Sequence, residues 1–175
     1  KELREKNGHA VGFITCYQGA SKIQCFLPKE ALENDAFNIP KEVRHDSQYP
    51  WNKVDSLLYD FQVKKIAPFS VAGVIWYQGE SNSSDRECEV YGEMLSALIY
   101  HWRVAFKDED LPFRVIQLAD YIHANKEAWR KIQQAQYDIQ FSEKKVKTVI
   151  CRDICESDDI HPKQKTQLAK RIADS

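Results

Sequence analysis

Residues 73–82 read GVIWYQGESN, a short apolar run that ends in a polar loop. The apolar run, Val71–Tyr77, has no strict alternation of apolar and polar residues, which is typical of a strand buried on both faces of a parallel sheet. Three further runs share this pattern and are predicted as strands: Ala10–Tyr17 (AVGFITCY), Phe113–Leu118 (FRVIQL) and Val146–Cys151 (VKTVIC). The sequence therefore predicts an α/β protein with a parallel sheet.

Helical patterns follow these strands. Over Glu87–Phe106, apolar residues recur at spacings of three and four, which predicts a long amphipathic helix. A second helix is predicted over Ala124–Phe141. A third is expected to begin near Pro162, because proline suits the first helical position, and to continue through Ile172. The alternation of strands and helices implies right-handed crossovers and a three-layer α/β/α sandwich.

The segment Leu27–Tyr59 is less regular. It contains Pro28, Pro40 and Pro50 and shows no sustained hydrophobic period. We expect a long connection with local helix that lies over the rim of the sheet, where binding residues of such folds concentrate.

The composition is that of one soluble domain. The 175 residues include 25 Lys and Arg against 26 Asp and Glu, for a formal net charge of −1, which excludes a nucleic-acid-binding arm or an acidic tail. With 43% hydrophobic residues the chain can bury a core. Its apolar runs are far shorter than the roughly 20 residues that a membrane helix needs, so we expect neither nucleic acid nor membrane as a partner.

The five cysteines stand at irregular positions: 16, 25, 88, 151 and 155. An odd number without a regular framework favours reduced thiols and a cytoplasmic location. The chain begins with Lys1, and its only methionine is Met94. We therefore expect residues 1–175 to be the C-terminal part of a single domain, with the N-terminal part of the same polypeptide as its partner.

Polar residues follow each predicted strand at its carboxyl end, where open parallel sheets bind ligands. The loops concerned are 18–21 (QGAS), 78–82 (QGESN), 119–121 (ADY) and 152–153 (RD), and 157–162 (SDDIHP) comes shortly afterwards. The sequence therefore predicts one rim that gathers amides, carboxylates, hydroxyls and a histidine.

His161 is the candidate general base of this rim. A carboxylate three residues earlier, Asp158, can accept the imidazole Nδ1–H and leave Nε2 facing the cleft. The alternative is structural: His161 packs at the start of a helix, and the two aspartates complement the helix dipole.

The QGESN loop is the candidate oxyanion site. The Gln78 amide can donate to a developing oxyanion, and Gly79 lets the backbone approach a ligand closely. Gly19 can likewise present a backbone N–H. An ordinary strand-to-helix turn favours the same residue types, so both readings stay open at this point.

Several stretches resemble the sialate O-acetylesterase family, within the SGNH hydrolase group of serine esterases. They are GVIWYQGESN at 73–82, DDIHP at 158–162 and YPWNKVDSLLYDFQVKKIAPF at 49–69; VGFITCYQGASKIQCFLP at 11–28 is similar to the family's second block, and WRKIQQAQ at 129–136 to the segment before its fourth strand. The resemblance covers nearly the whole chain. It implies a flavodoxin-like α/β/α fold and hydrolysis of O-acetyl esters of small sugars without a cofactor or metal, with sialic acids as substrates and acetyl-xylan-type esters as the alternative.

The resemblance also assigns the base. His161 would activate a serine and later protonate the leaving sugar hydroxyl, and Asp158 would orient it. Asp159 and Asp153 are the alternative carboxylates for that second role.

The resemblance places the remaining rim residues around the substrate. Gly19 would give a backbone donor to the oxyanion and Gln78 a side-chain donor. Glu80 and Asn82 would hold the loop in shape, and Ser21 lies in the second block. Trp51, in the segment YPWN, is the one tryptophan expected at the rim, while the other three fall in apolar patterns and are expected in the core.

The family's nucleophile motif, a Gly-Asp/Gln-Ser type turn, does not occur in this sequence. Only Ser21 and Ser81 follow a predicted strand closely. The second block reads QGAS where many relatives have paired glycines. We therefore expect the nucleophile on the family's first strand, N-terminal to residue 1, and an isolated chain that cannot complete acyl transfer alone.

Three other functions fit parts of the pattern. Cys151, Cys155, Asp158 and His161 fall within eleven positions and could be zinc ligands. Cys16 or Cys25 with His161 could form a cysteine hydrolase. A non-catalytic carbohydrate-binding fragment of the same fold is the third alternative.

Overall fold

The computed structural model describes residues 1–33, 35–43, 54–67, 69–84, 86–161, 163 and 165–175. Its sheet has three parallel strands in the order β1 (Val74–Trp76), β2 (Phe113–Ile116) and β3 (Val146–Val149). In register, Val74 pairs with Phe113, and Phe113 with Val146. The parallel sheet predicted from the apolar runs is confirmed, with strands shorter than the runs themselves.

The helices lie where the 3.6-residue period predicts them. The long ones are α4 (Tyr91–Phe106), α5 (Lys126–Ser142) and α6 (Lys165–Asp174). The shorter elements are α1 (Glu2–Asn7), α2 (Lys29–Glu33), α3 (Lys64–Ile66), 3-10 turns at Ile23–Phe26, Asp35–Phe37, Lys41–Val43, Glu80–Asn82 and Glu87–Val90, and a π-helical turn at Tyr59–Val63. The expected helix over Glu87–Phe106 is thus a 3-10 turn that continues into α4. The third helix begins later than expected, and Pro162 lies outside the described residues.

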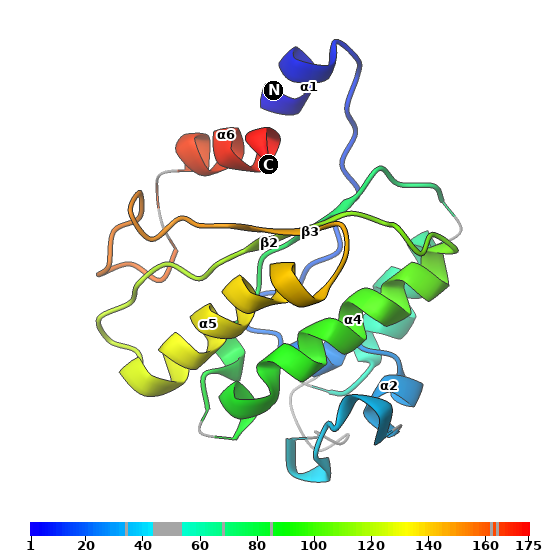
Figure 1. Cartoon of the computed structure of the whole chain (residues 1–175), viewed down its shortest axis with the longest axis vertical. Coiled ribbons are helices and arrows are strands. Elements are labelled where there is room, and N and C mark those ends of the chain that lie inside the picture. The colour runs from blue at the N-terminus through cyan, green and yellow to red at the C-terminus, as the bar shows by residue number, and fades with distance from the viewer. Residues whose placement is uncertain (34, 44–53, 68, 85, 162, 164) are drawn as a thin grey trace.

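Helices cover both faces of the sheet. Figure 1 shows α4 and α5 on one face and α6, with α1 beside it, on the other, which confirms the three-layer α/β/α arrangement. At the start of α5, the Asn125 side chain accepts from the backbone N–H groups of Glu127 and Ala128 at 3.1 and 3.3 Å, so the helix is capped.

The prediction of a strand over Ala10–Tyr17 is wrong. These residues form no strand, and their large side chains are exposed, with Phe13 at 66% and Tyr17 at 75% exposure. An apolar run becomes a strand only where a neighbouring strand pairs with its N–H and C=O groups. The described residues offer this segment no such partner.

The core confirms the prediction for three tryptophans. Trp76, Trp102 and Trp129 are at most 6% exposed, and the rings of Trp76 and Trp102 meet edge to face with centroids 5.9 Å apart. A smaller apolar cluster lies under α6 and includes Cys151 and Leu168.

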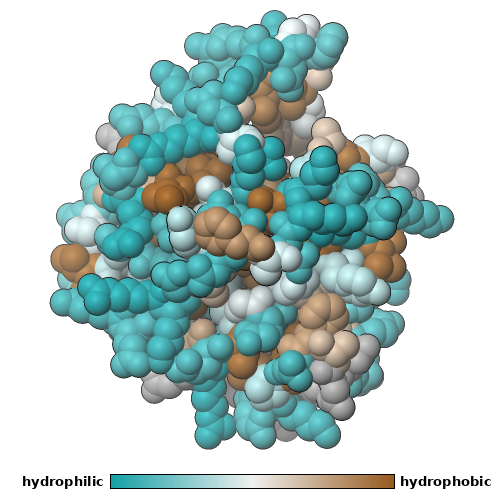
Figure 2. All heavy atoms as spheres, in the orientation of Figure 1, coloured by the Kyte–Doolittle hydropathy of each residue, from teal (hydrophilic) through white to brown (hydrophobic). Residues whose placement is uncertain are grey.

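In Figure 2, hydrophilic residues cover most of the visible face, with apolar residues in separate patches between them. None of the helices in the described part of the chain is long and apolar enough to cross a membrane.

Candidate functional site

The loop after β1 depends on Gly79. Its φ of 150° lies where L side chains are rarely found, and Asn82 N donates to Gly79 O at 2.9 Å to close the Glu80–Asn82 turn. A Cβ at this position would lie 3.0 Å from both Gln136 Nε2 and Ile132 Cγ2. The turn therefore needs glycine for its backbone conformation and for its close approach to α5.

We expect Gly79→Ala to lower the free energy of unfolding by about 3 kcal/mol, because the new methyl group strains φ and overpacks α5. Chemical denaturation measures the change. Gly12→Ala is the matched control, since a Cβ at Gly12 meets nothing within 4 Å. A loss below about 1 kcal/mol for Gly79→Ala would contradict the steric argument.

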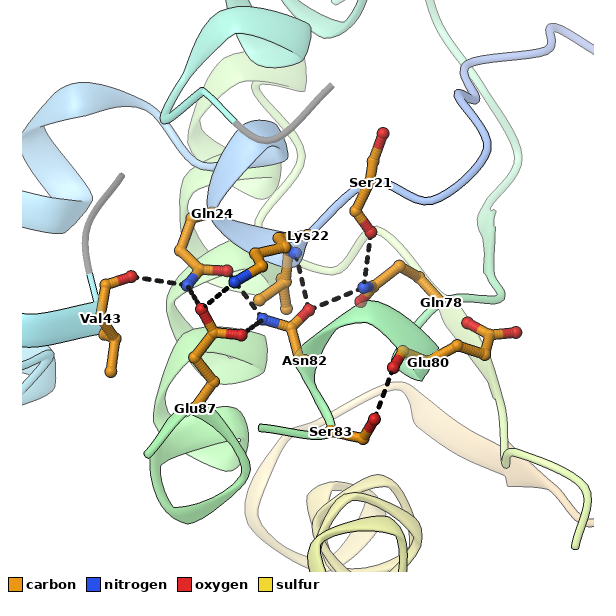
Figure 3. Close-up of polar contacts among 10 residues, drawn as sticks. Ser21, Lys22, Gln24, Val43, Gln78, Glu80, Asn82, Ser83 and Glu87 are labelled. Carbon is orange, nitrogen blue, oxygen red and sulfur yellow. Dashed lines mark hydrogen bonds and ion pairs between the residues drawn. The ribbon is translucent and has the colours of Figure 1, made fainter. Parts of the chain in front are cut away.

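Gln78 forms hydrogen bonds with the Ser21 segment and with its own loop at Asn82 (Figure 3), and also with helices α4 and α5. Its Nε2 donates to Ser21 O at 3.0 Å and to Asn82 Oδ1 at 2.8 Å. The Tyr91 hydroxyl lies 3.0 Å from Gln78 Oε1 and from Gln78 O, and Gln136 Nε2 donates to Gln78 O at 2.7 Å. The side chain is only 8% exposed, and both of its amide hydrogens have acceptors within the protein. Gln78 thus joins the loop after β1 to the second-block segment.

Asn82 is fully buried and uses its whole amide. Its Oδ1 accepts from Ile23 N at 3.0 Å, in addition to Gln78 Nε2. Its Nδ2 donates to Gln24 Oε1 at 2.8 Å and to Glu87 Oε2 at 3.3 Å. Asn82 therefore holds the loop after β1 against the Ile23–Phe26 turn.

Glu80 points away from this network (Figure 3). Burial raises the pKa of its carboxyl, while backbone hydrogen bonds at Glu80 and Gly79 and the nearby His161 and Lys165 act in the opposite direction. The Lys165 ammonium lies 5.2 Å from the centre of the Tyr77 ring. The start of α6, which follows the loop of His161, thus lies beside the end of β1 that leads into the QGESN loop.

His161 lies on an exposed loop before α6. Its backbone N donates to Asp159 Oδ1 at 2.8 Å, whereas no hydrogen bond joins the Asp158 carboxylate to the His161 imidazole. Asp153 is paired with Arg171 at 2.6 Å. Of the three candidate carboxylates, Asp159 is the one that contacts residue 161, through the backbone.

The second-block residues differ in exposure. Gly19 lies in an exposed turn, and the residue after it, Ala20, has the positive φ of 56°. Ser21 is 4% exposed, its carbonyl accepts from Gln78, and its buried hydroxyl has no hydrogen-bond partner among the described residues. Trp51 lies outside the described residues.

Several polar residues of the network were not predicted. Glu87 and Lys22 form an ion pair at 2.5 Å with side chains 4% and 14% exposed, and Tyr91 is fully buried. Gln136 carried a signal, because it is a polar residue on the apolar side of a predicted helix. Lys22 and Glu87 carried none, since charged residues next to turns are ordinarily solvated.

The structure disfavours the two alternatives of a cysteine hydrolase and a zinc site. All five cysteines are free thiols, and burial raises the pKa of Cys16 and of Cys25 to about 11, so neither is a thiolate at neutral pH. Among the described residues, no group of three or more His, Cys, Asp or Glu side chains could hold a metal ion. Within the described part of the chain, the alternative zinc cluster of Cys151, Cys155, Asp158 and His161 is therefore not assembled.

A parallel α/β sheet with polar loops after its strands belongs to the class of open α/β folds that bind ligands at this rim. The model of one family, carbohydrate esterases described as sialic acid-specific acetylesterases, matches residues 1–175. The chain belongs to this family.

Related proteins and structures agree with this assignment. The chain is 26% identical to human sialate O-acetylesterase over 98% of its own length, and 30% identical to the mouse protein over 67%. A carbohydrate acetylesterase from Xanthomonas citri superimposes with a TM-score of 0.84 at 31% identity over 98% of the chain, and an Arabidopsis thaliana protein with 0.56 at 25% identity over 67%. The chain spans 36% of the length of the human relative and 38% of the Xanthomonas one.

Proposed function

We propose that this chain forms part of an enzyme that hydrolyses O-acetyl esters of sugars, with O-acetyl sialic acids as substrates. The observation that carries the proposal is the hydrogen-bonded meeting of the QGESN loop with the second-block segment at Ser21, at the strand end where Lys165 of α6 contacts Tyr77. Acetyl-ester hydrolysis by the family and by the named relatives supports the choice of reaction.

In the proposed mechanism, a serine attacks the acetyl carbonyl while His161 takes its proton. The oxyanion that forms is stabilised by the Gly19 backbone N–H and by Gln78 Nε2, which exchanges its bond to Ser21 O for the substrate. His161 then protonates the sugar oxygen as it leaves, and a water activated by the same imidazole releases acetate. Asp158 is the proposed orienting carboxylate for His161, with Asp159 and Asp153 as the alternatives.

We propose that the nucleophilic serine belongs to a strand of the same polypeptide outside residues 1–175. Within the described residues β1 pairs only with β2, and its Ile75 is 42% exposed. The extended apolar segment 10–17 also lies exposed. A strand added at the free edge of β1 would cover Ile75 and bring its carboxyl end to the rim.

The test compares the isolated chain with the natural full-length polypeptide, using p-nitrophenyl acetate, O-acetyl sialic acid and an acetylated xylo-oligosaccharide. We expect the longer polypeptide to release acetate, with O-acetyl sialic acid preferred, and the isolated chain to be inactive. Turnover by the isolated chain that Ser21→Ala abolishes would place the nucleophile inside it. Binding of acetylated sugar without hydrolysis by the full-length protein would replace the esterase with a carbohydrate-binding function.

A further inference from the structure

We propose that Glu87 is a positioning residue that sets the orientation of the Gln78 amide through Asn82; the inference rests on the proposed esterase function. Glu87 is 3% exposed, and it reaches the QGESN loop through its hydrogen bond with the buried Asn82. Its carboxylate accepts from Lys22 Nζ at 2.5 Å, from Asn82 Nδ2 at 3.3 Å and from Gln24 Nε2 at 3.4 Å. In Figure 3 the Glu87 carboxylate is hydrogen-bonded to these amides, whereas the Glu80 carboxylate points away from them.

This carboxylate fixes which way the neighbouring amides turn, together with the backbone N–H of Ile23 and the backbone C=O of Val43. An ionised carboxylate only accepts hydrogen bonds and an ammonium only donates them, whereas a side-chain amide can turn either way. Glu87 therefore requires Asn82 to present its NH2 group, which leaves Asn82 Oδ1 for Ile23 N and Gln78 Nε2.

The same polarity passes on to Gln78. Because Asn82 presents oxygen, Gln78 must present Nε2 to it, and its Oε1 turns to the Tyr91 hydroxyl. Gln24 closes the arrangement: its Nε2 donates to Val43 O at 2.7 Å and to Glu87, and its Oε1 accepts from Asn82. The orientation of Gln78 Nε2, the proposed donor to the oxyanion, thus depends on the charge of Glu87, which acts through Asn82.

The variant Glu87→Gln keeps the shape of the side chain but replaces one acceptor oxygen with an NH2 donor. The oxygen of the new amide stays with Lys22, because two donors repel, so its NH2 group faces Asn82. Asn82 Nδ2 then meets a second donor at position 87, and turning its oxygen toward that donor takes the oxygen away from Ile23 N and Gln78 Nε2. Gln78 turns in response, and its NH2 group leaves the oxyanion position.

The experiment measures steady-state kinetics on p-nitrophenyl acetate and hydrogen exchange by mass spectrometry, both in the natural full-length polypeptide. We expect Glu87→Gln to lower kcat by about 10- to 100-fold with KM within about twofold, as misplacement of a catalytic donor does. We also expect the Ile23 amide, deprived of Asn82 Oδ1, to exchange at least about tenfold faster.

Two controls separate positioning from stability. Glu89→Gln changes an exposed carboxylate of the same turn, which pairs with Lys131 at 2.5 Å, and should alter neither readout. Leu98→Ala removes fully buried packing in α4, and should lower Tm while leaving kcat unchanged well below that temperature. If Glu87→Gln lowers Tm but leaves kcat unchanged, residue 87 has only a structural role, and the proposal is overturned.

The exchange measurement is independent of the enzymatic proposal. If the full-length protein hydrolyses no acetyl ester, the proposed function fails, yet faster exchange at Ile23 in Glu87→Gln still supports the orienting role. Unchanged exchange at Ile23 overturns that role whatever the activity.

Discussion

Replacing His161 by alanine is expected to lower kcat for acetyl-ester hydrolysis by about 1,000-fold, in the full-length polypeptide that carries the nucleophile. The imidazole is the base of the proposed mechanism in both acylation and deacylation, so its loss slows each step. The factor corresponds to about 4 kcal/mol of transition-state stabilisation. Stability should hardly change, because His161 is exposed and only its backbone N–H is bonded.

The matched control for this prediction is His9→Ala, which removes an exposed histidine far away in the sequence. Added imidazole should restore part of the activity of His161→Ala, whereas His9→Ala should keep the activity of the wild type. Equal kcat values for His161→Ala and the wild type would remove His161 from the mechanism and return it to the structural role at the start of α6.

Replacing Asn82 by alanine is expected to lower the free energy of unfolding by about 4 kcal/mol, which is roughly 10 °C in Tm for a chain of this size. The deletion leaves buried groups on both sides without partners: Ile23 N and Gln78 Nε2 lose an acceptor, and Gln24 Oε1 and Glu87 lose a donor. A buried polar group without a partner destabilises the folded state by more than a typical hydrogen bond stabilises it.

Thermal unfolding followed by circular dichroism measures this loss in the isolated chain. Gln134→Ala is the control, since Gln134 is an exposed amide that bonds only to the neighbouring Asp138. A Tm for Asn82→Ala within about 3 °C of the wild type would mean that water replaces the lost partners, and the network would then contribute little to stability.

The regular elements followed from the sequence because local patterns govern them. The period of three and four over Glu87–Phe106 needs one apolar face, and α4 presents one to the core. The apolar runs before Gln78 and Ala119 became β1 and β2 because each has a neighbour to pair with. Ala10–Tyr17 has an equally apolar pattern but no neighbouring strand among the described residues, so pattern alone misplaced it.

The candidate site was predictable only in part. The QGESN loop and the segment at Ser21 do meet as predicted, although Ala10–Tyr17, the run before that segment, forms no strand. The pairing of Asp158 with His161 was inferred from spacing, but the loop conformation bonds Asp159 to residue 161 instead. Loop geometry depends on contacts such as Arg171 with Asp153, which no local pattern encodes.

The amino-acid sequence by itself determined the α/β class and the three long helices, because the apolar patterns that predict them involve neighbours within a few residues. The tertiary structure alone decided that Lys22 and Glu87 meet in the interior and that Asn82 and Gln78 turn their amides as they do. Lys22 and Glu87 lie 65 positions apart in the chain, so only the fold brings them together. Asn82 lies 4 positions from Gln78 and 5 from Glu87, and the way these amides turn depends on the buried partners that surround them.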